Sequence, residues 1–93
     1  MVNTLADVTL STTATALSAT SIRAAWVQIQ GVTLTGQARV GDSKITTTRG
    51  GVLVAAGDAQ FFPTQGNANA YDLSTIFVLG TNGDKVAVLY DTF

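Results

Sequence analysis

Hydrophobic and polar residues alternate over several short segments of this chain, and glycine, proline or asparagine separates the segments. In residues 23–30, Ala25, Val27 and Ile29 fall on one side of an extended strand, while Trp26 falls on the other with two glutamines. No window of useful length repeats apolar residues with the period of a helix, and Thr, Val and Gly are poor helix formers. The pattern therefore predicts short β-strands and no helix, with Trp26 packed on a loop or a neighbouring strand.

Turn residues divide the rest of the chain in the same way. Gly41-Asp42-Ser43 and Gly57-Asp58 have the composition of tight turns, and Pro63 ends a strand because it has no N–H to donate. Residues 31–36 either break the chain or form an irregular strand, and residues 64–70 form a polar loop. The strands expected on this basis are 8–17, 23–30, 37–40, 44–48, 52–56, 59–62, 75–79 and 86–90. About eight short strands at this spacing predict one all-β domain over residues 1–93, a small antiparallel β-sandwich or barrel of jelly-roll-like type.

Asn82-Gly83 lies between two apolar segments, which is the strongest local signal for a two-residue β-hairpin. Such a loop sets the register, so that Phe77 pairs with Val88 and the neighbouring pairs follow. Both faces of this hairpin are apolar: Phe77, Leu79, Val86 and Val88 share one face, and Ile76, Val78, Ala87 and Leu89 share the other. We expect a second sheet of the same chain to cover one face and another subunit to cover the other.

The composition changes this picture in two ways. Charged residues make up 12% of the chain, with five basic and six acidic residues, against about 25% in typical soluble domains. No basic patch for nucleic acid is visible, no apolar run approaches the roughly 20 residues of a membrane span, and residues 1–7 do not resemble a signal peptide. A chain of 93 residues without cysteine has a small core and no disulfide, so oligomerisation is the expected support, with an ordinary monomer as the alternative.

Candidate chemistry is sparse. The chain contains no His, Cys or Glu, so only Lys44 or Lys85 could act as a base, and neither stands in a recognisable catalytic motif. Gly50-Gly51 lacks the spacing of a phosphate-binding loop and fits a bend or bulge between strands. Four aspartates, Asp42, Asp58, Asp72 and Asp84, could be imagined around Ca²⁺, but turn chemistry explains them better. The sequence therefore predicts no enzyme, no catalytic residue, no cofactor and no metal.

Aromatic residues supply the remaining candidates. Phe61 and Phe62 fall on opposite faces of one strand, so one can enter the core while the other meets solvent or a partner. Core filling is the competing interpretation for both. The residues expected at an assembly interface are Phe61, Phe62, Ile76, Val78, Leu89 and Phe93.

Five short segments form a further pattern: Ala14–Leu17, Val27–Gln30, Val40–Asp42, Gly50–Leu53 and Leu73–Val78. They contain a Thr-rich first strand, a Val-x-Ile-Gln strand, a Val-Gly-Asp turn, a Gly-x-x-Leu bend and a closing strand that begins Leu-Ser. In this combination the chain resembles small β-sandwich structural proteins of tailed bacteriophages. The resemblance extends over most of the chain and implies a virion component without catalytic residues.

The resemblance implies, more specifically, a head decoration or cement protein that stabilises the capsid. Its partners would be further copies of itself, a trimer being preferred because three-fold positions are common on capsid lattices, and the major capsid protein or another virion protein. It would be made in the host cytoplasm and reside in the virion, with no nucleic acid or membrane as partner. The alternative is a tail or fibre-associated module that binds host carbohydrate or another virion protein. Sugar binding would need a concave polar pocket with an aromatic floor.

Overall fold

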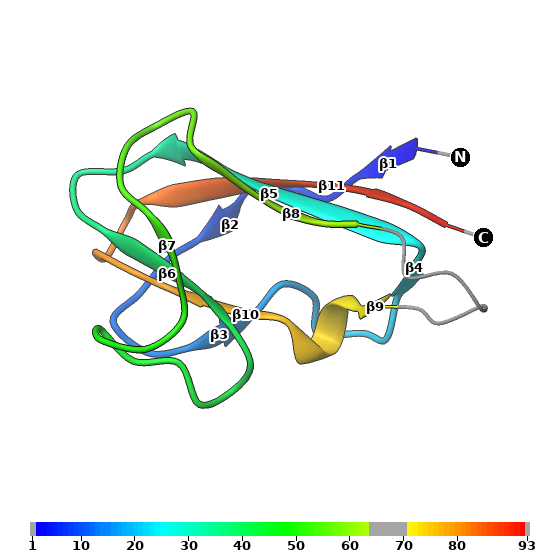
Figure 1. Cartoon of the computed structure of the whole chain (residues 1–93), viewed down its shortest axis with the longest axis horizontal. Helices are drawn as coiled ribbons and strands as arrows, with labels where there is room; N and C mark the ends of the chain where they lie inside the picture. The colour runs from blue at the N-terminus through cyan, green and yellow to red at the C-terminus, as the bar shows by residue number, and fades with distance from the viewer. Residues whose placement is uncertain (1, 64–70, 93) are drawn as a thin grey trace.

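Two antiparallel β-sheets pack face to face in the computed structural model of the protein (Figure 1). The structure describes residues 2–63 and 71–92. The strands are β1 (Val2–Thr4), β2 (Val8–Thr9), β3 (Thr15–Ala16), β4 (Arg23–Ala24), β5 (Trp26–Thr33), β6 (Ala38–Gly41), β7 (Gly51–Leu53), β8 (Ala59–Phe62), β9 (Tyr71–Asp72), β10 (Phe77–Leu79) and β11 (Lys85–Asp91), and η1 (Leu73–Thr75) is one turn of 3-10 helix. The prediction of an all-β fold is confirmed, and of its two forms the sandwich is present rather than the closed barrel.

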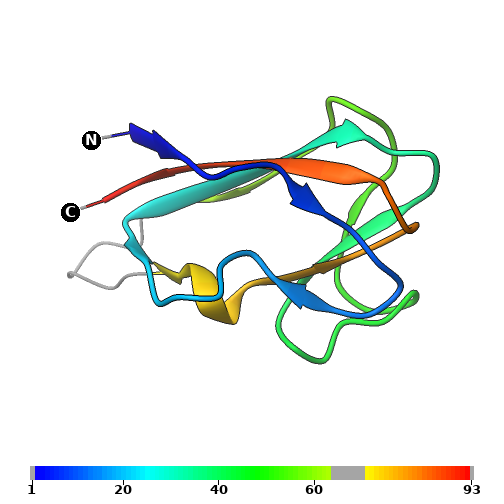
Figure 2. The same cartoon turned by 180° about the vertical axis from the view of Figure 1, so that it is seen from behind.

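The larger sheet has five strands with β11 and β5 at its centre. Strand β8 pairs with the free side of β5, while β1 and β2 follow one another along the free side of β11. Figure 2 shows β1 and β2 along this edge, with β1 beside the end of β11. The second sheet has the order β3-β10-β6-β7, and the short pair β4-β9 joins the two layers at one end.

The core lies between the sheets and receives alternate residues of their strands. In β5 the apolar residues Val27 and Ile29 are fully buried, and in β11 Val86 and Val88 are buried in the same way. The second sheet contributes Ala38, Val40, Leu53 and Val78 to the same cluster. The alternation predicted for residues 23–30 is thus confirmed from Trp26 to Gln30, but the predicted strand is divided, because Ala25 is a half-buried bend between β4 and β5 and Ala24 is the buried residue there. Trp26 lies on the outer side, 5.8 Å from the ring of Phe61 on the neighbouring strand, as predicted.

The predicted hairpin around Asn82-Gly83 is wrong. The local turn is present, because Gly83 has a φ of 89° and the amide of Asp84 donates to the carbonyl of Thr81 over 3.1 Å. However, β10 pairs with β6 and β3, whereas β11 pairs with β5, so the pair Phe77–Val88 does not exist. The turn carries the chain from one sheet to the other.

Asp84 explains this change of sheet. Its side chain is only 2% exposed, and its carboxylate accepts hydrogen bonds from the amide and hydroxyl of Thr35 at 2.9 and 3.0 Å and from the amide of Gly36 at 3.4 Å. Its backbone carbonyl accepts from the amide of Leu10 over 2.7 Å. A buried carboxylate needs such donors, so Asp84 joins the turn to the β5–β6 loop and to the segment after β2.

Other boundaries also differ from the predictions. Residues 44–48 do not form a strand, because Ile45 is buried against Gly41 and Gly50 and the chain turns there, with only the single bridge Thr46–Arg49. The predicted first strand is divided into β2 and β3. The turn of 3-10 helix at η1 was not expected. The region 31–36 follows the irregular-strand alternative, since β5 continues to Thr33 with a register shift opposite Lys85 and Val86.

Replacing the buried carboxylate tests this account of the fold. We expect Asp84→Ala to lower the free energy of unfolding by about 2–4 kcal/mol, because three donors lose a charged acceptor in a buried site. The matched control is Asp42→Ala, which removes an exposed carboxylate that accepts from the amide of Lys44 and should cost less than about 1 kcal/mol. Urea denaturation measures both, and equal losses would contradict the role given to Asp84.

Asp72 caps η1 and joins it to the loop before β4. The hydroxyl of Ser21 donates to its Oδ2 over 2.6 Å, and the amide and hydroxyl of Ser74 donate to its Oδ1 over 3.0 and 2.8 Å. These bonds, that of the Ser21 hydroxyl first, lower the pKa of Asp72 from 3.8 to about 2. Each of them favours the charged carboxylate over the neutral acid.

The lowered pKa of Asp72 predicts a dependence of stability on pH. Because the folded state favours the carboxylate, its contribution is complete above about pH 4 and is lost as the pH falls through about 2. We expect Asp72→Asn, which cannot ionise, to flatten the fall in unfolding free energy between these values. Urea denaturation of both proteins at several pH values measures the two slopes, and parallel slopes would count against the assignment.

Candidate functional site

The outer face of the five-stranded sheet is the first candidate site. Strand pairing places Thr4, Leu89, Gln28 and Phe61 in one row across β1, β11, β5 and β8, since paired residues of antiparallel strands share a face. A second row contains Val2, Asp91 and Trp26, and a third contains Ala87, Gln30 and Ala59. The first and third rows carry no charge, and the charged residues of β11, Lys85 and Asp91, lie to either side of them.

Large apolar side chains lie open on this face. Phe61 is 51% exposed and Val2 is 58% exposed, while Trp26 and Leu89 are half-buried. A groove of about 360 Å³ runs beside Leu89, and it is lined by Thr4, Leu5, Asp7, Gln28, Gln30, Ala87, Val88 and Leu89. The face therefore combines a projecting aromatic ring with a neighbouring groove, which are features that suit contact with another protein.

The predicted interface residues divide into four groups. Phe61 and Leu89 lie on the outer face described above, and Phe62 is half-buried on the opposite side of β8 with its ring 5.5 Å from that of Tyr71. Phe93 lies outside the described residues. The remaining two, Ile76 and Val78, are buried in the subunit's own core.

Placing Ile76 and Val78 at an interface was wrong. Their exposed fractions are 6% and 0%, because Val78 points inward from β10, an inner strand of the second sheet, and Ile76, between η1 and β10, packs into the same core cluster. The sequence analysis also did not include Val2 among the interface residues, and it assigned Trp26 only to local packing. Trp26 does pack locally, but it adds apolar area to the exposed face at the same time.

The aspartates considered as Ca²⁺ ligands do not form a metal centre within residues 2–63 and 71–92. No three aspartates of this part of the chain lie close enough to hold a metal ion. Asp42, Asp58 and Asp72 instead accept hydrogen bonds from backbone amides in turns, and Asp84 does so in the interior. None of the helical structure in the described residues is long or apolar enough to span a membrane.

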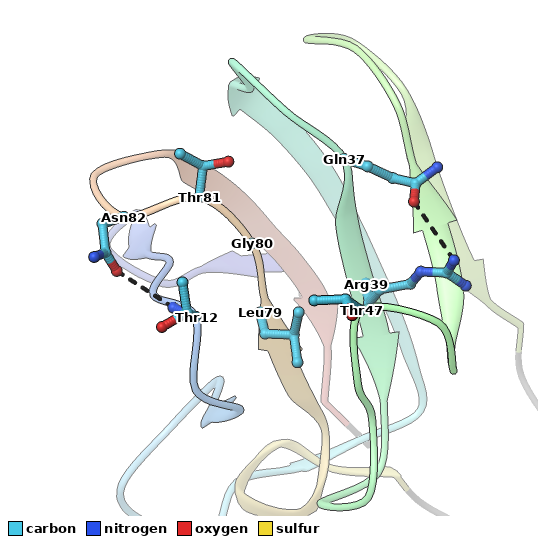
Figure 3. A pocket seen from close by; sticks show the side chains of 8 residues that line it. All are labelled: Thr12, Gln37, Arg39, Thr47, Leu79, Gly80, Thr81 and Asn82. Atoms are coloured by element: carbon cyan, nitrogen blue, oxygen red, sulfur yellow. Dashed lines mark hydrogen bonds between the residues drawn. The ribbon is translucent and has the colours of Figure 1, made fainter.

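A second candidate lies on the other side of the molecule, over the outer face of the four-stranded sheet (Figure 3). It is a hollow of about 470 Å³ lined by Thr12, Gln37, Arg39, Thr47, Leu79, Gly80, Thr81 and Asn82. Segments far apart in the sequence form it, and the amide of Thr12 donates to Oδ1 of Asn82 over 3.3 Å to join two of them. The hollow is concave and several polar side chains line it, but most of its lining surface is apolar and it includes no aromatic residue, so it does not have the polar wall and aromatic floor expected for carbohydrate binding.

Comparisons of the chain with protein-family models, with curated protein sequences and with solved structures find no match. The two surfaces described above and the resemblance of the sequence are therefore the features that bear on what this protein does.

Proposed function

We propose that this protein is a structural subunit that acts by protein–protein contact through the outer face of its five-stranded sheet. The observation that carries the proposal is the exposed apolar area of this face, with Phe61 half exposed beside Trp26 and without charge in its central rows. Subunits that work alone in water rarely leave a large contiguous apolar patch uncovered. Covering Phe61, Trp26 and Leu89 would remove this area from water.

The setting of this contact follows from the sequence resemblance. The resemblance to small β-sandwich proteins of tailed bacteriophages supports a capsid decoration or cement protein, made in the host cytoplasm and incorporated into the virion. Its partners are then further copies of itself, as a trimer, and the major capsid protein or another virion protein. A low charge suits this role, since a neutral contact is formed without desolvating ion pairs.

The oligomeric state of the purified protein tests the contact. We expect sedimentation velocity at micromolar concentrations to show an oligomer, with a trimer as the expected state. The association should differ little between about 50 and 500 mM salt, because charged residues contribute little to the contact. We expect Phe61→Ser to weaken this association at least about tenfold, since it removes the most exposed aromatic ring of the face.

A matched control variant shows whether the association depends on this face or on any exposed apolar residue. Val54 is 61% exposed but lies in the bend between β7 and β8, so Val54→Ser should leave the association unchanged. Thermal unfolding would show that both variants fold. A monomer at both salt concentrations, or an equal effect of the two variants, would overturn the proposed contact.

The virion setting needs a separate measurement. We expect the protein to co-sediment with empty capsids of the phage that encodes it, and Phe61→Ser to reduce the bound amount if the same face is used. If the protein associates with itself but binds no virion particle, the proposed decoration role is wrong, and the protein is an assembly protein of another kind.

A further inference from the structure

Arg39 has no counter-charge in the described part of the structure. It lies on β6 and lines the hollow over the four-stranded sheet, where one Nη donates to the carbonyl of Gly50 over 3.0 Å and the other to Oε1 of Gln37 over 3.4 Å. Both acceptors are neutral, and within residues 2–63 and 71–92 no carboxylate forms an ion pair with this guanidinium. The Nε atom is buried and has no hydrogen-bond partner. A half-buried cation in such surroundings is stabilised by an anion.

The other polar groups around the hollow are neutral. Its lining offers the hydroxyl groups of Thr12, Thr47 and Thr81 and the amides of Gln37 and Asn82. Most of the lining surface is nevertheless apolar, as is usual in small-molecule sites, and Arg39 is the one charged residue among the described residues of the lining. Hydroxyl and amide groups of this kind form hydrogen bonds with the hydroxyl groups of a ligand, and a cation adds selectivity for one acidic group.

We propose that this hollow binds a sugar acid, a polyol of monosaccharide size that carries one carboxylate. The carboxylate would accept from the guanidinium of Arg39, whose Nη atoms each retain a second N–H, while the hydroxyl groups of the ligand face the threonines and amides. The volume of about 470 Å³ lies within the range of roughly 300–1,000 Å³ that is usual for small-molecule sites.

Three other ligand classes fit the hollow less well. A neutral sugar lacks the charge that would compensate Arg39, and no aromatic ring is present in the lining to stack on it. A bare carboxylate leaves the hydroxyl and amide groups without partners. A phosphate carries more negative charge than the one cation of the lining can balance. The site lies on the opposite outer face from the proposed assembly contact, so the two proposals stand independently.

The test is an NMR titration of the full chain labelled with ¹⁵N, using sodium D-glucuronate as the probe at constant ionic strength. We expect saturable shifts in the amides of Thr12, Thr47 and Thr81 and in the Nε–H signal of Arg39. D-glucose, sodium acetate and sodium phosphate, titrated in the same way, should bind at least about tenfold more weakly.

Three variants assign the effect to the site. We expect Arg39→Gln to weaken glucuronate binding at least about tenfold, and Arg49→Gln, which removes an exposed cation outside the lining, to change it by less than about twofold. The spectrum of each variant reports whether it folds. Thr47→Ala, on an exposed segment, should weaken binding several-fold even if Arg39→Gln unfolds the protein.

Several results would overturn the proposal. Shifts that do not saturate with glucuronate up to about 50 mM would exclude a useful site. Equal binding of glucuronate with glucose, acetate or phosphate would remove the claimed selectivity. If Arg39→Gln and Arg49→Gln weaken glucuronate binding equally, the binding reflects the overall charge of the protein and not a site at Arg39.

Discussion

The buried carboxylate of Asp84 sets the relation between the two sheets. Asp84 is the last residue of the turn that begins at Thr81, and its carboxylate holds the β5–β6 loop through the amides of Thr35 and Gly36. The carboxylate is satisfied inside the protein in the arrangement in which the chain leaves the sheet of β10 and enters that of β11. The two apolar segments around the turn therefore face one another across the core and do not pair side by side.

This arrangement gives the subunit two different outer faces. Val86 and Val88 of β11 close the core from one side, and Val78 of β10 closes it from the other. The residues that alternate with these valines along each strand therefore point outward. On the larger sheet the outward positions of β11, β5 and β8 are mostly uncharged, which suits contact with protein. On the second sheet, Arg39 lies outward in a hollow between neighbouring segments, which suits a small ligand.

The sequence predicted those features that depend on neighbouring residues. The strand at Ala59–Phe62 was predicted with its observed bounds, because Gly57-Asp58 and Pro63 limit it on both sides. The alternation from Trp26 to Gln30 identified the buried side of β5, and Trp26 was expected beside a neighbouring strand. The Asx-type turn at Asp42 also follows from local composition.

Features that depend on distant residues could not be predicted in this way. Asn82-Gly83 indicates a turn, but the strands that β10 and β11 join are set by Asp84 and by partners dozens of residues away. For the same reason Ile76 and Val78 were assigned to an interface, since periodicity alone does not tell a core face from a contact face. The hollow at Arg39 combines segments near residues 12, 37–39, 47 and 79–82, and no local pattern joins them.

The central claim is that the turn at Asn82-Gly83 joins two sheets and is not the loop of a hairpin. Backbone NOEs in the NMR spectrum of the labelled protein test it directly, because paired antiparallel strands bring backbone protons close together. This account predicts cross-strand NOEs between Val88 and Ile29 and between Phe77 and Gly41, and none between Phe77 and Val88. Backbone NOEs between Phe77 and Val88 would contradict it.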